Sequence, residues 1–267
     1  MDLGLKGKVA LVTAASKGLG KASAMALAKE GARVAICSRG ESIELAAVEI
    51  RDAIHASGGT ANILALRGDI SVQADIDRIV SETIAHFGRI DILVLNAGGP
   101  PPGNFLDFTP DDWTATVNQT LMSAVRLLYA VIPGMRKRKE GSIVAIESVS
   151  VKQPIDKLIL SNSVRLAVIG LIKSLANEFG KDGIRVNSIN PTYTKTDRVT
   201  NILRSRAEAN GTRIEDETAS MINAVPLGRM GTPEEFGATV AWLASPAASY
   251  IHGHALMFDG GAVKAAL

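Results

Sequence analysis

The chain has 267 residues, of which 46% are hydrophobic and 21% charged, so a globular protein with a sizeable core is expected. The net charge of +2 argues against nucleic-acid and membrane-surface partners, and no run is expected to reach the roughly 20 apolar residues of a membrane span. Cys37 is the only cysteine, which excludes an intrachain disulfide. Because the N-terminus lacks the layout of a secretory signal, we expect a cytoplasmic protein.

Short apolar runs alternate with longer helical patterns along the chain. Several runs are apolar throughout, as is typical of parallel strands covered on both faces. The expected strands are Val9–Thr13, Arg33–Cys37, Ile63–Leu66, Ile90–Leu95, Ser142–Ile146 and Ile184–Ile189. The expected helices are Leu19–Glu30, Ser42–Ala56, Gln73–Phe87, Asp111–Lys137 and Leu158–Phe179. The alternation predicts one α/β domain over residues 1–267, a Rossmann-type doubly wound parallel sheet in a three-layer α/β/α arrangement.

Two segments indicate what lies around that sheet. Thr192–Val225 is polar and irregular and begins at the carboxyl end of an expected strand, where ligand-binding loops gather. We therefore expect a substrate lid at about 192–225, with a solvated helical excursion as the alternative. The helix Leu158–Phe179 is apolar nearly all round, and the sheet can cover only one of its faces. This predicts a homo-oligomer, a dimer or a tetramer.

The first expected strand, Val9–Thr13, runs into a glycine-containing turn and then a helix. Unpaired N–H groups at a helix N-terminus bind anions, and glycine lets the backbone approach a pyrophosphate closely. The turn therefore predicts a site for the pyrophosphate of a dinucleotide.

The end of the second expected strand bears on which dinucleotide binds. NAD enzymes of this architecture place an acid there for the ribose 2′-hydroxyl, but this strand leads into Ser38 and Arg39. Arg39 and Lys17 could together bind a 2′-phosphate, since guanidinium matches phosphate geometry. We predict NADP(H), with NAD less favoured; the alternative is that both cations are ordinary surface charges.

Several motifs, in order and at family spacing, resemble the short-chain dehydrogenase/reductase family over nearly the whole chain. Thr13–Gly20 resembles its glycine turn, with Ala14 in place of the first glycine, and Asp259-Gly260-Gly261 resembles its C-terminal motif. Asp69 resembles the acid that contacts adenine, and Asn190-Pro191 with Thr196 resembles the nicotinamide loop. The cofactor-binding residues that the turn and the resemblance imply are Thr13, Ala15, Ser16, Lys17, Gly18, Leu19, Gly20, Ser38, Arg39, Asp69, Ile70, Asn96, Ala97, Gly98, Arg165, Pro191, Thr194 and Thr196.

The expected reaction centre departs from that family. Ser148 and Asn118 match its substrate-orienting serine and active-site asparagine. In the family a catalytic tyrosine follows the serine by thirteen positions and a lysine follows the tyrosine by four. Here those positions are Ser161 and Arg165, and no tyrosine lies between Tyr129 and Tyr193. The residues expected to be catalytic are Asn118, Ser148, Ser161 and Arg165, and no metal is expected.

The substitutions leave the proton donor open. Carbonyl reduction needs a hydride and a proton, and a serine hydroxyl is a far weaker acid than a tyrosine near a cation. Arg165 keeps the positive field and could bind a ribose, but a guanidinium stays protonated. The alternatives are Tyr193, Lys152 or Lys157, and water held by the serines and Asn118. Glu147 is expected to point away from the substrate, because neighbours at a strand end face opposite sides.

Three functions fit these observations. The leading hypothesis is an NADP(H)-dependent oxidoreductase with an atypical proton-transfer site, acting on an alcohol/carbonyl pair in a small molecule. The alternative is a cofactor-binding pseudoenzyme with a regulatory or structural role. The third is lyase, dehydratase or isomerase chemistry on the same fold, because a fold does not fix a function.

Overall fold

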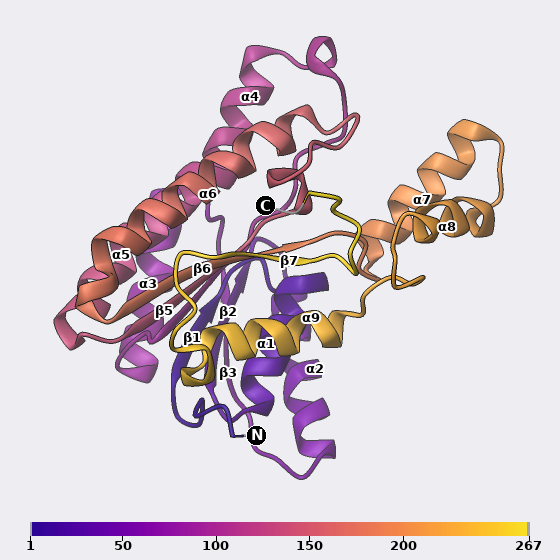
Figure 1. Cartoon of the computed structure of the whole chain (residues 1–267). Helices are drawn as coiled ribbons and strands as arrows, with labels where there is room; N and C mark the ends of the chain where they lie inside the picture. Colours follow the sequence, from indigo (N-terminus) through magenta and orange to yellow (C-terminus); the bar gives the residue numbers. More distant parts are fainter. Residues whose placement is uncertain (1, 266–267) are drawn as a thin grey trace.

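Seven strands form one parallel sheet in the computed structural model, which describes residues 2–265 (Figure 1). Their order across the sheet is β3-β2-β1-β4-β5-β6-β7. The strands are β1 (Val9–Val12), β2 (Arg33–Ser38), β3 (Asn62–Arg67), β4 (Ile92–Leu95), β5 (Gly141–Ile146), β6 (Ile184–Pro191) and β7 (Ala255–Phe258). The predicted fold class is confirmed. β7 is the strand that the sequence did not predict, since it is four residues long and only partly buried.

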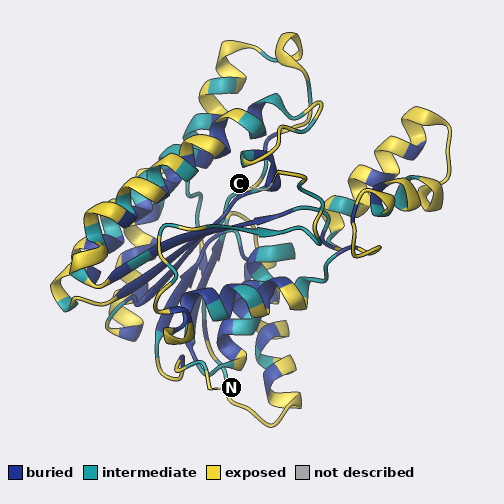
Figure 2. Cartoon of the chain, in the orientation of Figure 1, coloured by how far each residue is buried: buried dark blue, intermediate teal, exposed yellow. Residues whose placement is uncertain are grey.

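Helices cover both faces of this sheet. One face carries α1 (Gly18–Lys29), α2 (Ser42–Ala56) and α9 (Pro233–Ala244). The other carries α3 (Gln73–Phe87), α5 (Ser123–Arg138) and α6 (Ile159–Phe179). Figure 2 shows the strands buried between the two layers, with the outer helix faces exposed. The carboxyl ends of all seven strands therefore meet at one edge, where the candidate site lies.

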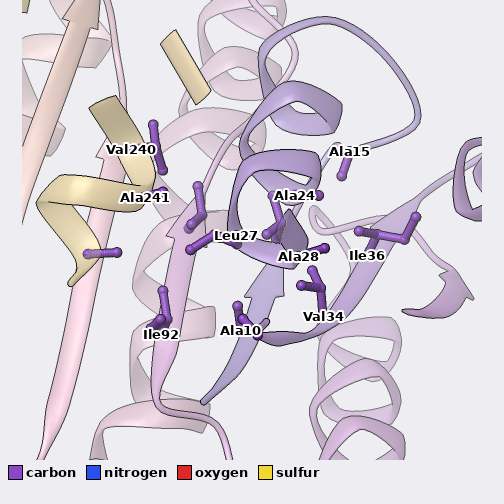
Figure 3. Packing of buried hydrophobic residues seen from close by; sticks show 14 of the residues in the cluster. Ala10, Ala15, Ala24, Leu27, Ala28, Val34, Ile36, Ile92, Val240 and Ala241 are labelled. Carbon is purple, nitrogen blue, oxygen red and sulfur yellow. The ribbon is translucent and has the colours of Figure 1, made fainter. Parts of the chain in front are cut away.

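The core under α1 is built largely from small side chains. Ala24 and Ala28 of α1 lie over Ala10 of β1 and Val34 of β2, and all four are buried (Figure 3). Because alanine adds little bulk, the helix packs close to the sheet. This fixes the start of α1, and with it the glycine turn, against the end of β1.

The predicted helix Asp111–Lys137 is interrupted. α4 (Pro110–Thr116) begins at a capping box formed by Thr109 and Asp112, and a π-helical turn, Val117–Met122, joins it to α5. Such turns are rare in proteins, and those that occur often lie at functional sites. Asn118 lies on this one.

α6 packs one face on the sheet, where Val164, Val168 and Ile172 are buried, while Leu166 stays 52% exposed. The segment Ile159–Asp182 is long and apolar enough to cross a membrane by composition, with a mean hydropathy of 1.4. The expectation that no run comes near a membrane span was therefore wrong. In this fold the segment forms part of one helical layer: one of its faces packs along β6, and 39% of its apolar window is buried.

The predicted lid segment consists mainly of two helices, α7 (Asp197–Asn210) and α8 (Ile214–Asn223), which project beyond the sheet edge (Figure 1). They share a small apolar cluster of their own, made of Leu203, Met221 and Met230, with Tyr193 packed against it. The segment is therefore mostly helical rather than irregular.

Candidate active site

Hydrogen bonds join the turn between β1 and α1 to the end of β4. The hydroxyl of Thr13 donates to the Asn96 carbonyl at 2.7 Å and accepts from the Asn96 N–H at 2.8 Å. The Asn96 side-chain amide also donates to the Ala14 carbonyl at 3.2 Å. A Cβ on Gly20 would lie 2.5 Å from that same carbonyl oxygen and 2.7 Å from the Asn96 amide nitrogen. Only glycine fits there, so the turn and the β4 end form one rigid unit.

The first turn of α1 is suited to bind an anion. Within the described residues, no side chain caps this helix: Lys17 occupies the N-cap with an extended backbone and makes no capping hydrogen bond, and the first turn carries no acid. Its N–H groups are therefore available, and the positive end of the helix dipole favours a negative ligand. The turn also requires a positive φ of 47° at Ala14 and 57° at Gly18.

Polar groups gather at the end of β2, as expected for a nucleotide site. The Ser38 hydroxyl oxygen is buried and has no hydrogen-bond partner among the described residues. Arg39 is exposed, and its guanidinium lies 3.9 Å from a carboxylate oxygen of Asp69. The other Asp69 oxygen accepts from the Ser71 N–H and hydroxyl at 2.8 and 2.7 Å. Asp69 is thus held in place while Arg39 remains free to contact a further anion.

The loop after β6 approaches the glycine turn from the other side. Pro191 and Thr194 are buried, and the Thr194 hydroxyl has no partner in the described part of the chain. A Cβ on Gly18 would lie 3.9 Å from the methyl group of Thr196, so the N-cap of α7 faces the N-terminus of α1. The predicted cofactor residues of β1, β4 and β6 therefore converge on one edge of the sheet.

The serines of the expected reaction centre lie together. Ser148 is the second residue after β5, and its hydroxyl accepts from the Ser150 N–H at 3.2 Å. The Ser150 and Ser161 hydroxyl oxygens are 3.4 Å apart, and both residues are buried. Ser150 was not predicted as a site residue; the bend after β5 brings it between the two serines that were.

Arg165 does not stand alone at this centre. One of its terminal nitrogens lies 3.0 Å from a carboxylate oxygen of Glu147, with side-chain exposures of only 9% and 6%. Burial raises the pKa of Glu147 to about 7, although Arg165 acts in the opposite direction. Strand alternation predicts that Glu147 points away from Ser148, but it does not reveal that the carboxyl meets Arg165 on α6, within the expected reaction centre. The missed signal is an acid at the end of an all-buried strand, which needs a cation nearby.

Asn118 makes its contacts elsewhere. Its side-chain oxygen accepts from Arg126 at 2.7 Å, and its amide is 3.4 Å from the Ser71 carbonyl. Arg126 also donates to that carbonyl at 3.0 Å, so these groups tie the π-helical turn to the loop after β3. No hydrogen bond joins Asn118 to the serines or Arg165 among the described residues. Arg126 is a second residue that the sequence did not identify.

The alternative proton donors lie in unsuitable surroundings. Tyr193 packs against the apolar cluster of the lid, and Lys152 and Lys157 are exposed. Another residue of the lid, Arg198, contacts the loop after β4: one of its guanidinium nitrogens lies 3.4 Å from the Pro100 carbonyl. Partial burial and the charge of Arg165 lower the pKa of Arg198, so the two cations share this end of the sheet.

A cavity of about 600 Å³ lies at the opposite edge of the sheet, near the amino-terminal ends of β4, β5 and β6. Its charged side chains are already engaged: Arg185 donates to the main-chain carbonyls that end α9, and Asp91 accepts from the Val9 N–H at 2.9 Å. Within residues 2–265, no group of three His, Cys, Asp or Glu side chains could hold a metal. The carboxyl edge therefore remains the candidate active site.

Fold and site together define a Rossmann-type α/β protein with an anion-binding glycine turn beside a cluster of serines. A family model described as enoyl-(acyl carrier protein) reductase matches residues 13–263. The chain belongs to the short-chain dehydrogenase/reductase family, and its relatives in that family are oxidoreductases.

Similar proteins include the oxidoreductase UcpA of Salmonella typhimurium, which is 35% identical over 96% of this chain and 95% of its own length. The 3-oxoacyl-[acyl-carrier-protein] reductase FabG of Vibrio cholerae is 36% identical over 97% of this chain and 98% of its own. The crystal structure of L-sorbose reductase from Gluconobacter frateurii, complexed with NADPH and L-sorbose, matches with a TM-score of 0.93. It is 31% identical and covers 99% of this chain and all of that one.

Proposed function

We propose that this protein is an NADP(H)-dependent oxidoreductase that interconverts an alcohol and a carbonyl group in a small molecule. The observation that carries the proposal is the uncapped, glycine-built N-terminus of α1, with Arg39 and the unpartnered Ser38 hydroxyl at the adjacent strand end. Two structural neighbours, L-sorbose reductase and a polyketide ketoreductase, were solved with NADPH, which supports the choice of cofactor.

The residues present fit this cofactor. In the proposal, the N–H groups at Gly18–Gly20 bind the pyrophosphate, and Lys17 with Arg39 binds the 2′-phosphate. Asp69 and Ile70 contact the adenine, and the residues on the nicotinamide side are Asn96, Ala97, Gly98, Pro191, Thr194 and Thr196. When bound, the reduced nicotinamide supplies the hydride.

At the reaction centre, we assign distinct tasks to the predicted residues. Ser148 orients the carbonyl by donating a hydrogen bond, and Asn118 holds the π-helical turn beside it. Arg165 supplies positive charge where negative charge develops on the substrate oxygen. Ser161, or a water it holds, passes the proton. This arrangement replaces the family's tyrosine and lysine.

Three further expectations remain part of the proposal. We propose that residues 192–225 close over the substrate, as Arg198 already reaches the Pro100 carbonyl. We propose a homo-oligomer, a dimer or tetramer, that covers the outer faces of α5 and α6, where Tyr129 is 80% and Leu166 is 52% exposed. A cytoplasmic location agrees with the single, buried cysteine.

Thermal stability with each nicotinamide tests the cofactor assignment. A ligand present at 100 times its dissociation constant stabilises a fold by about 2.7 kcal/mol, so saturating NADPH should raise the melting temperature clearly. NADH at the same concentration should do much less. Stabilisation by NADH alone would contradict the roles of Lys17 and Arg39. Activity is then tested with L-sorbose and a 3-oxoacyl thioester, the kinds of substrate that the relatives' names suggest.

The second candidate is a cofactor-binding pseudoenzyme with a regulatory or structural role. The observation that favours it is the buried ion pair of Arg165 and Glu147, in a site without the family's tyrosine and lysine. Tight NADPH binding without turnover of any carbonyl or alcohol, in a broad panel, would favour this candidate over the oxidoreductase.

A further inference from the structure

We propose that Glu147 is the catalytic acid and base of this protein, donating the proton in carbonyl reduction and accepting it in alcohol oxidation. The inference rests on the proposed oxidoreductase function and names the group that makes it possible without a tyrosine. It assigns Arg165 a second task, as the positioning residue of that carboxyl.

Most side chains at the proposed reaction centre cannot donate a proton. The hydroxyls of Ser148, Ser150 and Ser161 are very weak acids and cannot supply a proton at neutral pH on their own. A guanidinium does not release its proton in a protein, which excludes Arg165 as the source. Glu147 is the titratable acid in this cluster of described residues.

The alternatives outside the cluster are worse placed. Tyr193 is packed with the lid residues Leu203, Met221 and Met230. Lys152 and Lys157 lie in the solvent-exposed loop that precedes α6. None has a hydrogen bond to Ser148, Ser161 or Arg165. Among the side chains, the Glu147 carboxyl, which contacts Arg165 directly, is therefore the best-placed proton source.

Glu147 lies at the junction of β5 and α6. Glu147 immediately precedes Ser148 at the carboxyl end of β5, and its N–H is bound to the Ile189 carbonyl at 3.0 Å. Its carboxyl lies against Arg165, one helical turn from Ser161 on α6. The carboxyl therefore lies on the side of β5 that faces α6, the helix that also carries Ser161. A distance of one water molecule or less from the substrate oxygen is what proton transfer requires.

Charged groups surround the carboxyl on one side. Arg165 on α6 contacts it directly, and the charge of Arg165 lowers the pKa of Arg198 on α7. The neighbouring strand ends contribute neutral groups, Asn190 on β6 and Asn96 after β4, and Lys152 of the following turn is exposed. Burial raises the pKa of Glu147 to about 7, so the carboxyl exchanges its proton near neutral pH.

The step balances as follows. The carbonyl carbon accepts the hydride, and its π electrons move onto the oxygen. Glu147 gives up its O–H proton, which Ser161 or the water it holds passes to that oxygen, and the alcohol forms. The carboxylate that remains is stabilised by Arg165 at 3.0 Å and later regains a proton from solvent. Reduced cofactor, carbonyl and one proton become oxidised cofactor and alcohol. Formation of the full ion pair as the proton leaves favours the forward step.

The pH dependence of kcat for reduction, with NADPH saturating and L-sorbose or a 3-oxoacyl thioester as substrate, tests the assignment. Wild-type kcat should fall as pH rises through about 7, because the protonated form of Glu147 is the donor. Glutamine has the shape of glutamate but cannot titrate. In Glu147→Gln, kcat should therefore drop roughly 10²–10⁴-fold and no longer fall as pH rises through about 7. Glu178→Gln, on the exposed far side of α6, is the matched control and should behave as wild type.

Arg165→Met separates catalysis from structure. Because Arg165 holds the pKa of Glu147 down, its removal should move the pH limb upward. A merely structural ion pair would give no such shift. If Glu147→Gln folds poorly with Arg165 left unpaired, the double variant Glu147→Gln/Arg165→Met removes both charges and should fold, yet remain without the limb.

Infrared spectroscopy of the protein without cofactor gives a readout that does not depend on activity. A protonated carboxyl band should disappear as pH rises through about 7, be missing in Glu147→Gln and persist to higher pH in Arg165→Met. Absence of that band at pH 6 would overturn the assignment, as would an unchanged pH limb in an active Glu147→Gln. A wild-type protein that binds NADPH but reduces no probe overturns the oxidoreductase proposal itself, and this one with it.

Discussion

The glycine turn after β1 and the junction of β5 with α6 lie at the same edge of the sheet but are held together differently. In the turn, main-chain carbonyls and N–H groups make the contacts, with one hydroxyl and one amide side chain, Thr13 and Asn96. At the junction, the key contact is a buried ion pair between side chains eighteen positions apart, on different elements. Main-chain groups thus hold the turn together, whereas charged side chains from two elements hold the junction.

The largest difference should appear in the pH dependence of stability. The pKa of Glu147 is about 7 in the folded chain and near 4.5 in the unfolded chain, so the folded state holds the proton more tightly. Stability contributed by this group is therefore complete below pH 4.5 and is lost as pH rises to about 7. The loss should amount to at most about 3 kcal/mol. Urea denaturation from pH 5 to 8 should show it as a difference between wild type and Glu147→Gln; parallel curves would contradict it.

Gly20→Ala tests the turn by steric overlap. The new Cβ would lie 2.5 Å from the Ala14 carbonyl oxygen, so the turn must move. We expect a loss of about 2 kcal/mol in unfolding free energy and at least tenfold weaker NADPH binding, measured by denaturation and fluorescence titration. Gly170→Ala on α6 is the control, since its Cβ meets nothing within 4 Å and helix propensity should rise. Equal NADPH affinity in both variants would show that the turn does not bind the cofactor.

Arg39→Ser tests selectivity at the end of β2. The guanidinium is exposed beside Asp69, where we place the 2′-phosphate. Its removal should weaken NADPH binding roughly tenfold, about 1.4 kcal/mol, and leave NADH binding unchanged. Lys29→Gln, a charge loss at the far end of α1, should change neither dissociation constant. An equal loss for both nucleotides in Arg39→Ser would place the arginine elsewhere on the cofactor.

Ala14→Gly is the smallest expected effect and has the opposite sign. Ala14 holds a φ of 47°, a conformation that glycine adopts without the steric cost of a Cβ. The variant should gain about 1 kcal/mol in unfolding free energy, while Ala26→Gly in the middle of α1 should lose about as much. A destabilised Ala14→Gly would mean that the strain at this turn is not relieved by glycine.

The sequence predicts those parts of the molecule that depend on contiguous pattern. Apolar runs and glycine positions located six strands and the turn after β1, since periodicity and backbone conformation are local properties. The π-helical turn at Asn118 escaped because it changes backbone hydrogen bonding without changing the apolar pattern. β7 escaped because it is short and half-buried at the sheet edge.

The sequence predicts which positions along the chain form the candidate site, but not which side chains contact one another there. Spacing from Ser148 locates Ser161 and Arg165 without any structure. Glu147 and Arg126 were missed because their partners, Arg165 and Asn118, lie on other elements or another turn, and the fold alone decides which charges meet. Which charged side chains meet at the candidate site is therefore a tertiary property, which spacing along the chain does not reveal.

A single-turnover measurement tests the central claim most directly. NADPH oxidation would be followed by stopped-flow absorbance after mixing the NADPH complex with substrate at pH 6 and at pH 8.5, for wild type and Glu147→Gln. We predict a transient in wild type that is at least tenfold faster at pH 6 than at pH 8.5, and a slow transient in Glu147→Gln that is equal at both. Equal rates at both pH values in wild type, or the wild-type ratio retained in Glu147→Gln, would contradict the account.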